Sequence, residues 1–122
     1  MIEIVKKFIK AYNSFDIEGM LVLLDPDIHF VNMSGGEVDS ETHGKAEFEA
    51  LARMSAKLFK ERRQQITSFA ESDDVVKAEI RFTAVLSAGM SEGIKNDQKI
   101  DLTGKSEYKI KDNLILSILD IS

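Results

Sequence analysis

The stretch VKAEIRFTAVL, residues 76–86, alternates small or apolar side chains with charged or polar ones. The stretch IDLTGKSEYKI, residues 100–110, repeats the pattern. Successive side chains of a β-strand point to opposite faces of the sheet, so the alternation predicts two long strands, each with one sheltered and one wet face. The sheltered face could be solid core or the wall of a pocket.

Length and composition indicate one small domain. The 122 residues fit a single domain, 1–122, and the absence of cysteine excludes disulfides, zinc–thiolate sites and cysteine nucleophiles. The formal net charge of −5 opposes nucleic-acid phosphates and anionic lipid, so we expect no nucleic-acid or membrane partner. The early charges at the N-terminus are unlike a secretory signal, which, with the lack of cysteine, favours a cytoplasmic location.

The first half of the chain has helical spacing. One apolar face follows the i, i+3, i+4, i+7 pattern at Ile4, Val5, Phe8, Ile9 and Tyr12. Asp16 is the predicted N-cap of a short second helix, which Pro26 should end. A third helix is predicted from Gly44 to about Lys60, and a basic cluster marks its wet carboxyl end: Lys57, Lys60, Arg62 and Arg63.

Shorter strands are predicted around the two long ones, over residues 28–33, 37–43, 64–71 and 114–121. The order α-α-β-β-α-β-β-β-β indicates an α+β domain with a curved antiparallel (mixed) sheet wrapped around the N-terminal helices. A loop over residues 87–97 separates the long strands, and Asp112-Asn113 is a predicted hairpin turn. Gly104 is expected to mark a bulge or bend. The last strand is apolar on both faces, so it should be central or lie in a subunit interface.

Three segments carry a resemblance to a known superfamily: FIKAYNSFDIEGMLVLLDPDIHF (8–30), HGKAEFEAL (43–51) and SEYKIKDNLILSILDIS (106–122). In these segments the chain resembles the nuclear transport factor 2-like superfamily, also called cystatin-like, and within it the SnoaL-like and ketosteroid-isomerase-related proteins. The resemblance covers almost the whole chain. It implies a cone-shaped domain with a pocket closed by the helices, and frequently a dimer through the outer face of the sheet.

Ketosteroid isomerases of this superfamily use a carboxylate base, a tyrosine and a protonated aspartate. By the resemblance, these three positions fall on Asn32, Phe8 and about Ser106. An asparagine cannot accept a proton as a carboxylate does, and a phenylalanine has no hydrogen-bond donor. Steroid isomerisation is therefore not expected.

SnoaL-type polyketide cyclases place an acidic or histidine acid/base in the cavity. The resemblance points to Asp120, near the end of the last strand, as the candidate catalytic residue. Burial beside Ile118 and Leu119 would raise its pKa toward a useful value. His43, beside the glycine that opens the third helix, is a second candidate acid/base.

The predicted ligand-binding pocket has six lining residues: Tyr12, Phe30, Asn32, Phe82, Ser106 and Tyr108. Asn32 could orient a ligand carbonyl or bond to a neighbouring loop. Tyr12 could line the pocket or simply pack against the core, and Ser106 could donate into the pocket or to the backbone.

The residues with metal-ligand character are His29, Asp39, Glu41 and His43, of which the last three could share one strand face. Such mixtures are common on solvated strand edges, so we expect no metal and no other cofactor. His29 is out of phase with Ile28 and Phe30, and should face away from the pocket.

Two classes of function are compatible with these residues and with the resemblance. The first is a pocket for a small apolar molecule, used for binding alone or for lyase, cyclase or isomerase chemistry with an acid/base in the cone. The second is a non-catalytic dimeric interaction module. A homodimer through the sheet is expected, because Ile115, Leu119 or Ile121 would be partly exposed in a monomer. A cavity lined by Asn32 and an ionisable residue would favour the pocket, whereas a cone filled by phenylalanines would exclude it: Phe8, Phe59, Phe69 and Phe82.

Overall fold

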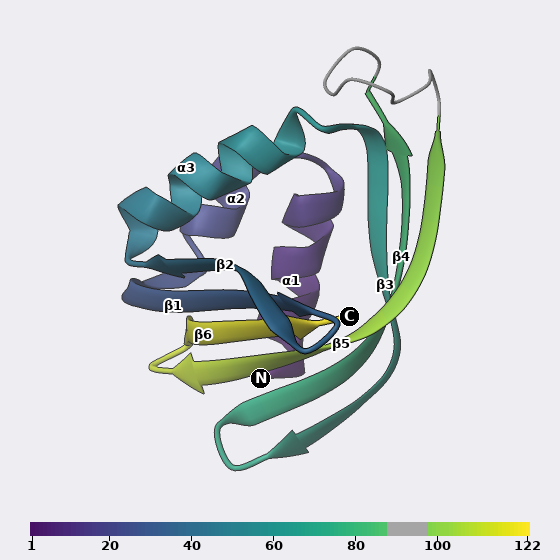
Figure 1. Ribbon diagram of the computed structural model, residues 1–122. Coiled ribbons are helices and arrows are strands. Elements are labelled where there is room, and N and C mark those ends of the chain that lie inside the picture. Colours follow the sequence, from purple (N-terminus) through teal and green to yellow (C-terminus); the bar gives the residue numbers. More distant parts are fainter. Residues whose placement is uncertain (88–97) are drawn as a thin grey trace.

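The computed structural model describes residues 1–87 and 98–122 (Figure 1). Within these ranges the chain forms three helices and six strands: α1 (Ile2–Asn13), α2 (Ile17–Leu21), β1 (Leu24–Ser34), β2 (Glu37–His43), α3 (Lys45–Ala56), β3 (Phe59–Ser72), β4 (Val75–Leu86), β5 (Lys99–Lys111) and β6 (Leu114–Ile121). This order confirms the prediction. The predicted loop over 87–97 lies, from residue 88 on, outside the described residues. None of the described helices is long and apolar enough to cross a membrane.

The strands form one mixed sheet in the order β2-β1-β6-β5-β4-β3. β1 and β6 run parallel, and the other neighbouring strands run antiparallel. In Figure 1 the long strands β3, β4 and β5 curve around one side of the helices, and the sheet does not close on itself. The curved mixed sheet around the helices is the predicted α+β architecture.

The last strand is central, which is one of the two places that its sequence allowed. β6 lies between β1 and β5, and the hairpin turn before it has the predicted left-handed residues, Asp112 at φ 51° and Asn113 at φ 63°. Ile115 is fully buried within the single chain because it pairs with Leu24 under the helices, so the expectation that it would be exposed in a monomer is wrong. Ile121, at the strand end, is 39% exposed.

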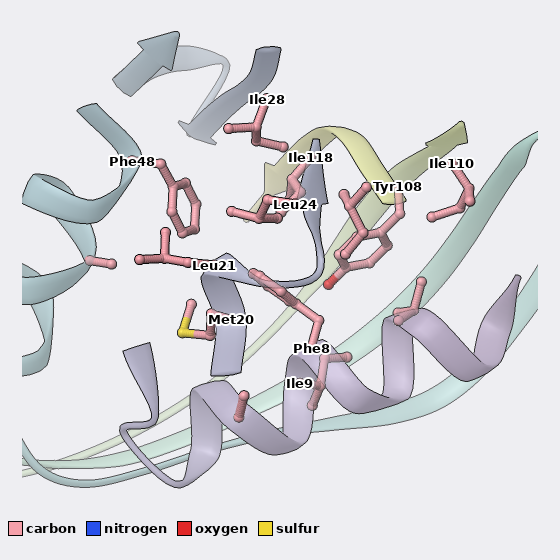
Figure 2. Packing of buried hydrophobic residues seen from close by; sticks show 14 of the residues in the cluster. Phe8, Ile9, Met20, Leu21, Leu24, Ile28, Phe48, Tyr108, Ile110 and Ile118 are labelled. Atoms are coloured by element: carbon pink, nitrogen blue, oxygen red, sulfur yellow. The ribbon is translucent and has the colours of Figure 1, made fainter. Parts of the chain in front are cut away.

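The core lies between the inner face of the sheet and the helices (Figure 2). The ring of Phe8 in α1 has its centroid 6.3 Å from that of Phe48 in α3 and 6.4 Å from that of Tyr108 in β5. Leu24 and Ile28 of β1 are fully buried. Each such side chain contributes about 1.5–3 kcal/mol by its burial, so this cluster holds α1 and α3 against the sheet.

Helix α2 is shorter than its leucine-rich sequence predicts. Asp16 is the N-cap, as predicted, and accepts a hydrogen bond from the backbone N–H of Gly19. The helix ends at Leu21, however, and β1 begins at Leu24. Pro26 therefore lies inside β1 rather than ending a helix, at a shift in the register between β1 and β6, where its missing N–H costs no ladder bond.

Helix α3 also ends early, and this moves the basic cluster. The helix stops at Ala56, and Phe59 begins β3, where it pairs with Leu86 of β4. Arg62 is thus a strand residue and is only 5% exposed, so its predicted place at the wet end of the third helix is wrong. Tertiary pairing with β4 extends β3 into a segment whose apolar spacing is also compatible with a helix.

Gly104 does not mark a bulge between β4 and β5, because it pairs with Ile80 in unbroken register. The reason for the glycine is a close backbone approach. A Cβ atom at this position would lie 2.6 Å from the carbonyl oxygen of Ile121, at the end of β6. The missing side chain also leaves space on the inner face, where Gly104 lines the cavity.

Candidate functional site

A cavity of about 390 Å³ lies between the inner face of the sheet and the helices. Its lining comes from all three described helices and all six described strands. The half-exposed Leu102 and the exposed Lys105 belong to its wall, so the cavity reaches the surface. All six residues predicted for the pocket line this cavity, and so does Asp120: Tyr12, Phe30, Asn32, Phe82, Ser106 and Tyr108.

Strand pairing places the polar groups of the cavity in one row. Asn32 of β1 pairs with Asp120 of β6, and Asp120 pairs with Ser106 of β5. Directly paired residues of neighbouring strands have their side chains on the same face. Two residues earlier in β1 and β6, the next pair on the same face is apolar, with Phe30 beside Ile118. The cavity wall therefore consists of a polar row above an apolar one.

Asp120 is the acidic group of this row. The hydroxyl of Ser106 donates a hydrogen bond of 2.6 Å to Oδ1 of Asp120. Burial raises the pKa of Asp120 to about 6, although the hydrogen bond from Ser106 acts in the opposite direction. A carboxyl with this pKa exchanges a proton readily near neutral pH, which is what a general acid or base requires.

Two further polar groups are held beside this carboxyl. Burial, with a smaller contribution from the Asp120 charge, raises the pKa of Tyr108, so its hydroxyl keeps its proton. The Asn32 side-chain amide donates a hydrogen bond of 3.3 Å to Asp39 of β2. Asn32 thus lines the cavity and also bonds to the neighbouring strand β2.

Arg62 is the cavity residue that sequence reasoning missed. It lines the cavity from β3, its Nε donates a hydrogen bond of 2.8 Å to the backbone oxygen of Tyr12, and burial lowers its pKa. Tyr12 belongs to the last turn of α1. The Arg62 cation therefore does lie at the carboxyl end of a helix, but this helix is α1 and not α3, which precedes Arg62 in the chain. Residues 60–65 are all polar, so no alternation in the sequence marks Arg62 as an inward residue.

Tyr12 contacts both Arg62 and the apolar wall. Its ring centroid lies 6.5 Å from that of Phe82, and the Arg62 guanidinium carbon lies 3.7 Å above the Tyr12 ring. Burial raises the pKa of Tyr12, while the Arg62 charge acts against this shift and the Asp120 charge adds to it. Tyr12 therefore both packs and lines the cavity.

His43 is not part of the cavity. It lies with His29 and Glu41 on the exposed outer side of β1 and β2, where the two imidazole rings stack with centroids 4.5 Å apart. The Nε2 atoms of His29 and His43 lie 2.7 Å and 3.4 Å from Oε2 of Glu41. The hydrogen bond with His29 lowers the pKa of Glu41. Strand alternation turns His43 away from the cavity, so an acid/base role for it there is not supported.

The same trio is the one group of described residues with metal-ligand geometry, since its ligand atoms lie within 4.8 Å of one another. Two imidazoles and a carboxylate are ligands that a divalent transition metal accepts. Asp39, the fourth residue in the predicted set, bonds to Asn32 instead. His29 faces away from the pocket, as its phase in the strand predicts.

With the fold and the cavity in view, the chain can be placed in a family. A profile of the SnoaL-like domain matches residues 5–118, so the chain belongs to the SnoaL-like family of the nuclear transport factor 2-like superfamily. No curated protein matches the sequence at a significant level.

Solved structures share the same cystatin-like fold. A polyketide cyclase candidate from Xanthomonas campestris pv. campestris is 23% identical, with a TM-score of 0.75 over 99% of this chain and 88% of its own. A ketosteroid isomerase-like protein from Catenulispora acidiphila, in complex with trimethylamine, is 14% identical, with a TM-score of 0.80 over 97% and 83%. An uncharacterised cystatin-fold protein from Novosphingobium aromaticivorans is 17% identical, with a TM-score of 0.75 over 98% and 96%.

The raised pKa of Asp120 predicts a stability that depends on pH. The carboxyl ionises near its ordinary pKa of 3.8 in the unfolded chain and near about 6 in the folded one. The contribution of Asp120 to the free energy of unfolding is complete below pH 3.8. It is lost as the pH rises through about 6, and this loss is at most about 3 kcal/mol. Asp120→Asn keeps an acceptor for Ser106 without the charge. We expect this variant to be more stable than the wild type at about pH 7.5 but not at about pH 4, in urea unfolding.

Asp101→Asn is the matched control for this measurement. Asp101 is exposed, and its hydrogen bonds with Arg81 lower its pKa, so the sign of its contribution is reversed. This variant should be slightly less stable than the wild type at neutral pH. An advantage of Asp120→Asn that is equal at both pH values would contradict the raised pKa.

Proposed function

We propose that this protein binds a small, largely apolar organic molecule in the cavity between its sheet and its helices. The observation that carries the proposal is the cavity itself: about 390 Å³, with aromatic and aliphatic walls and a few convergent polar groups. Ligand sites in proteins have this size and character. The polar groups, Asn32, Ser106 and Asp120, form a row at one part of the wall, which would fix the orientation of a bound molecule.

The phenylalanines that could have filled the cone leave it open. Phe8, Phe59 and Phe82 line the cavity rather than closing it, and Phe69 is 48% exposed beneath Lys6. The presence of trimethylamine in one structural neighbour adds support, since it is a small organic molecule bound to a protein of the same fold.

Filling the cavity should abolish binding. Ser55 of α3 lines the cavity, whereas its neighbour Met54 is 65% exposed and does not. We expect Ser55→Trp to weaken binding of the neutral fluorescent probe phenylnaphthylamine by about tenfold or more, because the indole occupies the space. Met54→Trp is the control and should bind as the wild type does. Equal binding by both variants would locate the probe outside the cavity and contradict the proposal.

A second candidate function is proton transfer to or from the bound molecule, as in a lyase, cyclase or isomerase. The observation that favours it is the Asp120 carboxyl, which is held by Ser106 on the cavity wall and has its pKa raised by burial to about 6. In its ionised form Asp120 would take a proton from a C–H group next to a carbonyl, and in its protonated form it would return the proton.

Proton transfer can be tested with β-tetralone, a ketone with weakly acidic C–H groups beside its carbonyl. We expect the wild type to accelerate exchange of these hydrogens for deuterium, followed by NMR, with a rate that rises as the pH passes about 6 because Asp120 loses its proton. Asp120→Asn should lose about a hundredfold or more of this acceleration, and Asp101→Asn none. Undiminished exchange by Asp120→Asn would rule out this role.

We also propose that two copies pair through the outer face of the sheet. Val31 pairs with Leu119, and Met33 with Ile121, on the face opposite to Phe30, so these four apolar side chains form an outer patch. The support is that all four are at least partly exposed in the single chain.

Pairing through this patch predicts a dimer in sedimentation at micromolar protein concentration. Leu119→Glu should shift the equilibrium to the monomer, because a buried unpaired carboxylate opposes association. Thr83→Glu, on the outer face but away from the patch, should leave the dimer intact. A wild type that is purely monomeric would contradict this proposal.

A further inference from the structure

Arg62 is a cation inside the cavity that the proposed chemistry does not use. Two aromatic rings hold its guanidinium, whose carbon lies 3.7 Å from the ring centroid of Tyr12 and 4.4 Å from that of Phe15. Its Nε donates to the backbone oxygen of Tyr12. Stacking and this hydrogen bond fix the plane of the guanidinium, which is the arrangement in which an arginine binds an anion with good geometry.

One nitrogen of the Arg62 guanidinium has no hydrogen-bond acceptor within residues 1–87 and 98–122. Nη2 of Arg62 is buried, and it has no hydrogen-bond partner among the residues that the structure describes. None of the ion pairs found among those residues includes Arg62. A buried, charged N–H group without an acceptor is unfavourable. Since Arg62 lines the cavity, a small shift of its side chain would bring this group to a ligand oxygen that accepts its hydrogen bond and removes that cost.

We propose that the molecule bound in the cavity is an organic anion with its charge on oxygen, a carboxylate, phenolate or enolate, and that this oxygen binds Arg62. This inference rests on the proposed function, because it names the class of ligand that the same cavity takes. A single negative charge matches the single buried guanidinium. The rest of the molecule is largely apolar, since the wall that Arg62 shares includes the rings of Tyr12, Phe59 and Phe82 beside the amide of Gln64.

The position of Arg62 also orients the ligand. Arg62 lies in β3 and Asp120 in β6, and β4 and β5 separate these strands in the sheet. Both residues line the one cavity, and the charges of both act on Tyr12, which lines it too. An anion at Arg62 is therefore separate from the Asp120 carboxyl, and the body of the molecule extends toward the row of Asn32, Asp120 and Ser106.

The test compares two probes that differ in one charged group: anilinonaphthalene sulfonate, an organic anion with its charge on oxygen, and the neutral phenylnaphthylamine. Their dissociation constants are measured by fluorescence for the wild type, Arg62→Met, Arg62→Lys and the control Arg63→Met. Arg63 is the next residue in β3 and is exposed, so its removal changes the net charge equally without altering the cavity.

We expect Arg62→Met to weaken binding of the anion by about tenfold or more relative to the neutral probe, as removal of a charge-assisted hydrogen bond does. Arg62→Lys should show a smaller loss, and Arg63→Met no change in the ratio. If both probes bind and the ratio is the same in wild type and Arg62→Met, this inference is overturned while the proposed function stands. If neither probe binds the wild type, the proposed function fails, and this inference fails with it.

A measurement on the wild type covers the case in which Arg62→Met does not fold. In isotope-labelled protein, the guanidinium N–H resonances of Arg62, assigned with Arg62→Lys, should shift on saturation with anilinonaphthalene sulfonate and shift less with phenylnaphthylamine. Equal shifts with the two probes, or no shift with the anion, would overturn the inference.

Discussion

The parallel pairing of β6 with β1 is the constraint on which the rest of the structure depends. It inserts the last strand of the chain between the first strand and β5, and so joins the two ends of the sequence in one sheet. The register of this pairing sets Asp120 beside Asn32, and the antiparallel pairing with β5 sets it beside Ser106. A shift of β6 by one residue would turn Asp120 to the outer face and away from Asn32 and Ser106, so the register of β6 defines the site.

The packed aromatic residues around the cavity stabilise it, whereas the charged groups in its wall do not. Phe8, Phe48 and Tyr108 pack together in its wall, whereas Asp120 and Arg62 are charged groups that line the cavity. Burial works against both charged forms, as the directions of their pKa shifts show. Groups kept at such a cost are typical of sites that bind or react, since a purely structural role is served better by apolar side chains.

The relation to ketosteroid isomerases becomes clearer in the structure. The position that the resemblance assigns to the isomerase base is Asn32, which cannot accept a proton as a carboxylate does, but its direct partner across the strand pair is the carboxyl of Asp120. The position assigned to the isomerase tyrosine is Phe8, which packs against Tyr108 in the core. The family cone is kept, while the acidic group lies one strand away.

Local sequence determined the order of the elements and the inward faces of the two long strands, because alternation in strands and helical spacing are periodic properties of the chain itself. Asn32, Ser106 and Asp120 could be assigned to the inner face for this reason, and all three line the cavity. Only tertiary structure decided where α3 stops, that Arg62 lies inside, and that His43 lies outside with Glu41. These outcomes depend on pairing with strands far away in the sequence, whose hydrogen bonds and burial outweigh local preference.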